Sequence, residues 1–111
     1  MNLPNGKAAQ LGDKLERYCL NPIHPKGKDK ATLFRLRLGI TLENKAILEA
    51  ALLEAAIAGN AVLYQADEYG IQYDIWFQMS TDTSNALVLS CWIIRQDEDF
   101  PRLTNTYPVN R

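Results

Sequence analysis

The residues best suited to chemistry lie in one loop, residues 21–30. It holds His24, the one histidine of the chain, whose unperturbed pKa of about 6.5 suits proton transfer near neutrality. Cleavage of RNA without a metal needs a base for the ribose 2′-hydroxyl, cations for the charged phosphorane and an acid for the leaving oxygen. The loop therefore favours His24 as the base, with Lys28 and Lys30 binding the phosphate.

A structural role for the same loop stays open. Pro22 and Pro25 restrict the residue before each of them to extended backbone, which stiffens the loop and fixes the direction of His24. The imidazole could then cap or brace a turn, with the lysines in solvent. Gly27 permits either a tight turn or the close approach of a ligand. The free N–H groups of the helix that follows would favour an anion.

A second group of candidates flanks an acidic turn at residues 96–100. Arg95 precedes this turn and Arg102 follows it. Strict alternation along the next strand would place Arg102, Thr104 and Thr106 on one face, where they could clamp a phosphate. The alternative is a surface arginine paired with an acid of residues 97–99.

Trp76 falls on the polar face of an alternating strand. There it could stack a nucleobase or cover a protein contact, although such a residue often packs under a helix. The proposed catalytic set is His24, Lys30 and Arg102, and the proposed binding set is Gly27, Lys28, Trp76, Arg95, Thr104 and Thr106.

The sequence gives no reason to expect a metal or a cofactor. Cys19 and Cys91 lie far apart, and with one histidine they form no zinc motif. No phosphate-binding glycine motif and no GxSxG motif occurs. Both cysteines sit among apolar residues, which predicts buried free thiols in a reducing cytoplasm, although a disulfide stays open.

The net charge of −1 gives the whole chain no nucleic-acid signature, but a local basic patch can still attract a phosphate. Residues 26–37 form such a patch, in which Asp29 is the one acid and the cations are Lys26, Lys28, Lys30, Arg35 and Arg37. No apolar run approaches the roughly 18 residues of a membrane span, and no signal peptide is visible. We expect one cytoplasmic domain, residues 1–111, without membrane contact.

The elements that must position these residues divide the chain into a helical part and a sheet. Residues 1–10 are predicted to be an irregular arm, and the helical part, residues 11–59, contains the His24 loop. After residue 60 the hydrophobic period changes to two, which predicts a four-stranded antiparallel meander over residues 60–109. The fold class is α+β. The expected helices are residues 12–20, 29–38 and 42–58, and the expected strands are residues 61–67, 71–79, 86–95 and 103–109.

Several short motifs resemble a bacterial family of domains of unknown function. The loop matches an HPxGxxKA pattern through His24-Pro25, Gly27 and Lys30-Ala31, and further matches are Trp92-Ile93-Ile94, Pro101-Arg102-Leu103 and Tyr107-Pro108. The resemblance runs from Leu3 to Val109. It implies small free-standing proteins or the C-terminal domains of adhesin-like and toxin-like proteins. A weaker, fold-level similarity links the chain to barnase/EndoU/colicin/RelE-like ribonuclease toxins, which work without metal.

One position departs from the family pattern. Asn105 stands two residues before the closing Tyr-Pro, where the family usually has Ser or Thr. Hydroxyls occur instead at Thr104 and Thr106. If the family hydroxyl is catalytic, the resemblance implies that this chain is altered there.

Two functions follow from these observations, and whether the chain is an enzyme stays open. The first is a metal-independent, ribonuclease-like toxin domain with RNA bound at the His24 loop; it requires His24, Lys30 and Arg102 to converge. The second is a non-catalytic module that binds a small antitoxin or immunity-type protein through Trp76 and the basic loop. It predicts an exposed apolar patch and no pocket at His24.

Overall fold

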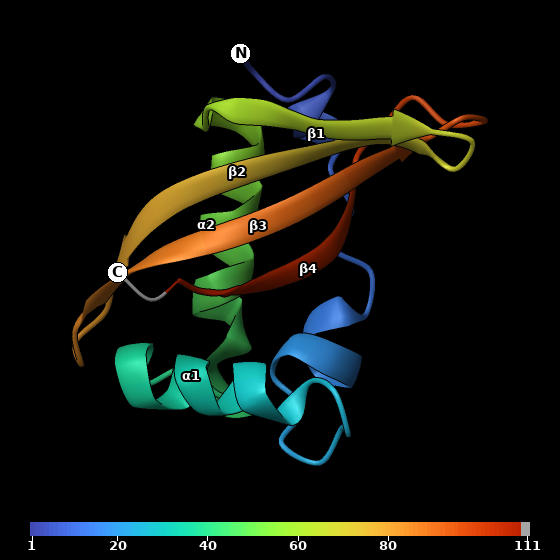
Figure 1. Ribbon diagram of the computed structural model, residues 1–111. Helices are drawn as coiled ribbons and strands as arrows, with labels where there is room; N and C mark the ends of the chain where they lie inside the picture. The colour runs from blue at the N-terminus through green and yellow to red at the C-terminus, as the bar shows by residue number, and fades with distance from the viewer. Residues whose placement is uncertain (110–111) are drawn as a thin grey trace.

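The chain builds its helices first and its sheet second (Figure 1). The structure, a computed structural model, describes residues 1–109. The helical part comprises short turns at Gly6–Ala8, Leu15–Cys19 and Leu42–Asn44, helix α1 (Lys28–Leu38) and helix α2 (Lys45–Ala58). The strands are β1 (Ala61–Asp67), β2 (Gly70–Ser80), β3 (Asn85–Arg95) and β4 (Arg102–Pro108), and they pair antiparallel in the order β1-β2-β3-β4. The predicted α+β meander is confirmed.

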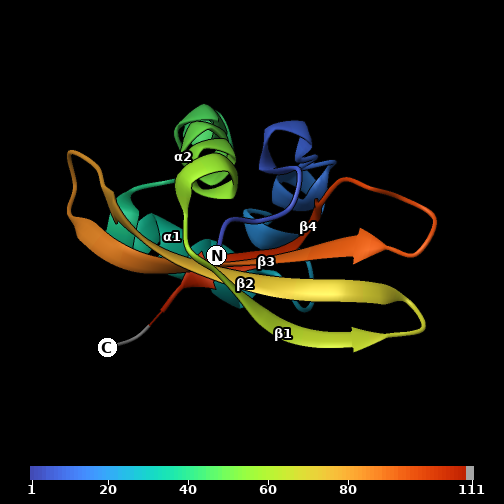
Figure 2. The ribbon, with the colours of Figure 1, turned by 90° about the horizontal axis from the view of Figure 1, so that it is seen from above.

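One face of the sheet is covered and the other is open. Figure 2 shows α2 and the N-terminal turns on one side of the strands, whereas α1 lies near the level of the sheet. Helix α1 packs along the β4 edge. The core between the layers contains Phe34, Leu52, Ile75 and Trp92, all fully buried. Burial of such large apolar side chains supplies most of the favourable free energy of folding.

The predicted helix boundaries hold where the capping chemistry is clear. Gly39 has φ 67°, and its N–H donates to the Arg35 carbonyl (3.0 Å), so it ends α1 as predicted. Thr41 caps the next segment, because its Oγ1 accepts from Glu43 N–H (3.2 Å). The predicted helix over residues 42–58 is divided into the 3₁₀ turn and α2.

The N-terminal region departs from its prediction in two ways. The helix expected over residues 12–20 is a single π-helical turn, Leu15–Cys19, in which Leu20 N–H donates to the Leu15 carbonyl (2.9 Å). The arm, residues 1–10, contains a 3₁₀ turn and is docked: Leu3 is buried, and Gln10 bridges to Arg102. Apolar positions of the arm fill the space over the sheet that a longer helix would occupy.

The alternation predicted for β4 is wrong because the strand contains a bulge. The register shifts beside Thr104, so that Arg102 lies opposite Ile93 while Thr106 lies opposite Ser90. An extra residue moves every later side chain to the other face. Arg102 and Thr106 therefore lie on opposite faces. Thr106 is fully buried, and its Oγ1 donates to the Leu89 carbonyl (2.8 Å), so it is closed to a ligand.

No helix within residues 1–109 combines the length and the hydropathy that crossing a membrane requires.

Candidate functional site

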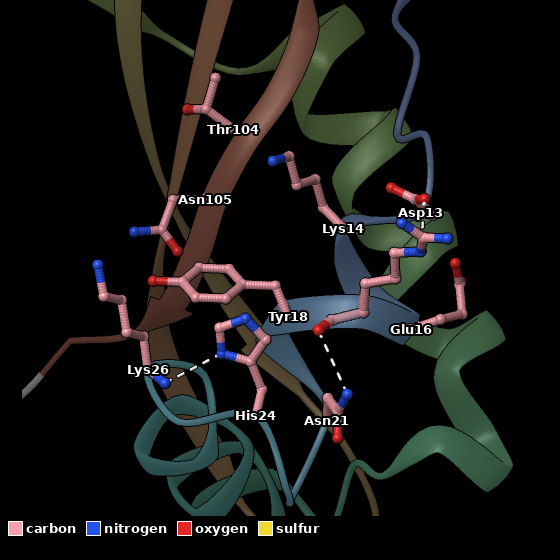
Figure 3. Close-up of a pocket in the computed structure, with 10 residues that line it drawn as sticks. Asp13, Lys14, Glu16, Tyr18, Asn21, His24, Lys26, Thr104 and Asn105 are labelled. Atoms are coloured by element: carbon pink, nitrogen blue, oxygen red, sulfur yellow. Dashed lines mark hydrogen bonds and ion pairs between the residues drawn. The ribbon is translucent and has the colours of Figure 1, made fainter.

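A pocket of about 760 Å³ opens where the His24 loop, the π-helical turn and β4 meet (Figure 3). The residues that give it its chemistry are Lys14, Tyr18, His24, Lys26, Thr104 and Asn105. The loop and the last strand, far apart in sequence, therefore share one surface. This meeting is the geometry that the nuclease hypothesis requires of the last strand.

His24 braces the loop with one nitrogen and leaves the other free. Its Nδ1 accepts from the backbone N–H groups of Lys26 (3.0 Å) and Gly27 (2.9 Å). With Nδ1 accepting, the proton of the neutral imidazole lies on Nε2, which is then a donor. Figure 3 shows Nε2 directed toward the side of the pocket where Tyr18 and Asn105 lie. The structural alternative is thus present, and Nε2–H has no hydrogen bond to another residue of the described range 1–109.

Tyr18 orients His24 and is itself held by Lys30. The Tyr18 and His24 rings meet edge to face, with centroids 5.1 Å apart and an interplanar angle of 82°. Lys30 Nζ donates to the Tyr18 hydroxyl (2.9 Å) and lies 5.5 Å from the centroid of the Tyr107 ring. Lys30 is therefore behind Tyr18, not on the pocket surface. Tyr18 was missed in the sequence because it read as one more apolar position of a helix.

Gly27 is required by a backbone contact. A Cβ at this position would lie 2.0 Å from the Tyr18 carbonyl oxygen, so the loop and the π-helical turn can approach only if residue 27 is glycine. The next residue, Lys28, has an exposed side chain, and its N–H donates to the His24 carbonyl (2.9 Å). The His24–Pro25 peptide bond is trans.

Arg95 and Arg102 share a second hollow, of about 280 Å³, which also contains Lys14 and Thr104 and so adjoins the first. Arg102 donates twice to the Glu98 carboxylate (2.8 and 2.7 Å). These bonds raise the pKa of Arg102 and lower the pKa of Glu98. The arginine is thus paired within the acidic turn, and it lines the adjoining hollow, not the His24 pocket. With Lys30 behind Tyr18, the predicted convergence of His24, Lys30 and Arg102 on one pocket is therefore not observed.

The charges around the His24 pocket leave an excess of cations. Arg17 is paired with Asp13 (3.0 Å), and Glu16 is paired with Lys45 (2.8 Å). The two remaining lysines of the pocket, Lys14 and Lys26, form no ion pair with any residue of the described range 1–109. The pocket therefore suits an anion.

Trp76 lies elsewhere. It is 44% exposed on the open face of the sheet, opposite Leu89 of β3. This exposure disagrees with the alternative that it packs under a helix. It belongs to a different surface from His24.

The cysteines are free thiols, and Cys19 is fully buried. Burial raises the pKa of the Cys19 thiol to about 11. Burial and the nearby Asp74 carboxylate raise the pKa of Cys91 to about 12. Within residues 1–109, no group of three His, Cys, Asp or Glu side chains is arranged to hold a metal.

Comparisons with known proteins agree with this architecture. Residues 2–110 match the model of a family described as "Domain of unknown function (DUF6883)". No curated protein matches the chain at a significant level. Among solved structures, the chain is similar to a "Contact-dependent growth inhibition toxin - immunity protein complex from Klebsiella pneumoniae 342", with a TM-score of 0.70 and 16% sequence identity. The match covers 92% of this chain and 99% of that chain, and at this identity it shows a shared fold.

Proposed function

This chain belongs to the DUF6883 family, and we propose that it is a toxin-like domain that binds RNA at the His24 pocket and cleaves it without a metal. The observation that carries the proposal is the meeting of the His24 loop with β4 in one cationic pocket. The similar structure from Klebsiella is that of a toxin–immunity complex, which supports a role as one member of such a pair.

The pocket offers one phosphate three kinds of donor. His24 Nε2–H is directed by the turn, Lys14 and Lys26 supply charge, and the Asn105 amide comes from β4. The adjoining hollow, with Arg95, receives the next phosphate along a strand. A single-stranded RNA would follow β4 from one hollow into the other.

The chemistry that fits is attack by the ribose 2′-oxygen on phosphorus. The bond to the 5′-oxygen breaks, leaving a 2′,3′-cyclic phosphate and a 5′-hydroxyl. A water molecule takes the proton of the 2′-hydroxyl, and water returns one proton to the 5′-oxygen. Because Nδ1 accepts from two N–H groups, His24 contributes here as a donor to the phosphorane oxygens. Its use as the base would require those two bonds to break.

The decisive experiment separates the two roles of His24: Nδ1 holds the loop, and Nε2–H donates to the RNA. In His24→Asn, the side-chain oxygen takes the place of Nδ1 and keeps the turn, but Nε2–H is lost. In His24→Gln, the side-chain amide takes the place of Nε2, but the brace is lost. We expect RNA cleavage in EDTA to fall about 10²–10³-fold in His24→Asn, with its melting temperature unchanged. Full activity in that variant, or no cleavage by the wild type, would contradict the proposal.

A second function, an immunity-type partner of a toxin, is favoured by the apolar residues exposed on β1 and β2. Val62, Tyr64 and Trp76 are 46%, 64% and 44% exposed. Expression in bacteria distinguishes the two roles. A toxin slows growth, and His24→Asn relieves the effect. An immunity-type protein leaves growth unchanged, with or without His24.

A further inference from the structure

A third hollow, of about 290 Å³, lies on the open face of the sheet. It is lined by Tyr64 of β1, Asp74 of β2, Cys91 of β3, and Asn105 and Tyr107 of β4. The register explains this grouping. Asp74, Cys91 and Asn105 lie opposite one another in adjacent strands, and the next row contains Trp76, Leu89 and Tyr107.

Asp74 is a half-buried carboxylate without a cation. No residue in the described range 1–109 forms an ion pair with it. Lys30, which contacts the Tyr107 ring, donates instead to the Tyr18 hydroxyl. A partly desolvated carboxylate gains from a positive partner that displaces its remaining water. The Asp74 carboxylate accepts from the Cys91 thiol, and the hollow therefore presents a carboxylate that has a hydrogen bond but no paired cation within residues 1–109.

The walls of the hollow are aromatic. Tyr64 is well exposed, Tyr107 is half-buried, and Trp76 lies in the neighbouring row. Aromatic faces attract a cation by about 0.5–1 kcal/mol when exposed and by more when desolvated. A planar guanidinium stacks on such rings while it pairs with a carboxylate. These features together fit an arginine side chain.

We propose that the open face of the sheet docks a protein partner that inserts an arginine or lysine side chain into this hollow, against Asp74 and between Tyr64 and Tyr107. The surrounding charge is complementary to a basic partner. The turns at one end of the sheet carry the exposed acids Asp67, Glu68, Asp97 and Asp99. The proposal does not rest on RNA binding at His24.

The test uses small probes of the inserted side chain. N-acetyl-arginine methylamide is titrated into the ¹⁵N-labelled protein, and N-acetyl-citrulline methylamide, which is similar in shape but uncharged, is titrated in parallel. We expect the arginine probe to shift the Trp76 indole and Asp74 amide signals saturably and to bind at least tenfold more tightly than the citrulline probe. Added salt weakens a charge-driven contact.

Two variants locate the effect. Asp74→Asn keeps the shape but removes the charge, and we expect it to weaken arginine binding at least tenfold. Asp82→Asn removes one exposed carboxylate from the β2–β3 loop and should leave binding unchanged. Equal binding of both probes, the absence of shifts, or unchanged binding in Asp74→Asn would overturn the proposal. Guanosine binding to this face in place of arginine would also overturn it and would indicate a nucleobase site. RNA cleavage at His24 is measured separately, so the two proposals fail independently.

Discussion

At the scale of single residues, the side chains with chemistry are held by short, local contacts. His24 accepts from two N–H groups that lie two and three residues further along the chain, so its position is set by the loop alone. This local geometry could be predicted as an alternative from the prolines and Gly27. The contacts of Tyr18 with His24 and of Lys30 with Tyr18 could not be predicted, because they depend on how the π-helical turn packs on α1.

Cys19 makes a pH-dependence testable at this scale. Its pKa is raised from 9.0 to about 11, so the folded state favours the neutral thiol. The contribution of Cys19 to stability is therefore full below pH 9 and is lost as the pH rises toward 11. We expect the free energy of unfolding to fall in this window more steeply in the wild type than in Cys19→Ala. Parallel curves for the two proteins, measured with urea, would contradict the prediction.

At the scale of elements, the hydrophobic period predicted the strands well, because alternation over seven or more residues is a strong signal. All four strands lie within one or two residues of their expected bounds. The bulge at Thr104 was missed because one unpaired residue leaves no mark on composition. It removed Thr106 from the candidate site and placed Thr104 and Asn105 there. The π-helical turn was missed for a similar reason, since apolar spacing does not distinguish it from an α-helix.

The approach of the His24 loop to the π-helical turn gives a prediction for Gly27. In Gly27→Ala, the new methyl group would meet the Tyr18 carbonyl, and the two elements must separate. We expect a loss of about 2–4 kcal/mol in the free energy of unfolding, together with weaker RNA binding. Gly12→Ala is the matched control. Its φ of 59° also disfavours alanine, but nothing lies within 4 Å of a Cβ there, so its cost should be near 1 kcal/mol. Equal losses would show that the close approach is unimportant.

At the scale of the whole molecule, the net charge of −1 conceals two surfaces of opposite sign. Unpaired lysines surround the His24 pocket, whereas an unpaired carboxylate and acidic turns mark the open sheet face. The sequence revealed the basic stretch at residues 26–37, but not which of its cations face the His24 pocket. Lys30 is directed onto aromatic rings, while Lys14, outside that stretch, is brought to the pocket. Only the tertiary fold determines which charges share a surface.

This division predicts the salt dependence of RNA binding. Each phosphate contact on a single strand contributes about −0.7 to the slope of log K against log salt concentration. Replacing Lys14 and Lys26 together by Ala should therefore make the slope about 1.4 units shallower. Lys7→Ala, an exposed lysine of the N-terminal turn, should leave it unchanged. An unchanged slope in the double variant would place the RNA elsewhere on the molecule.

Thr104 and Asn105 line two hollows, the His24 pocket and the hollow at Asp74. β4 is the edge strand of the sheet, and the two hollows meet at these two residues. A ligand that moves the side chain of Thr104 or Asn105 in one hollow therefore alters the affinity of the other hollow for its own ligand. Thermodynamic linkage makes this effect mutual: a protein that binds at the Asp74 hollow and weakens RNA binding is itself weakened by RNA to the same degree. A protein bound at the Asp74 hollow would thus inhibit RNA binding without covering the His24 pocket.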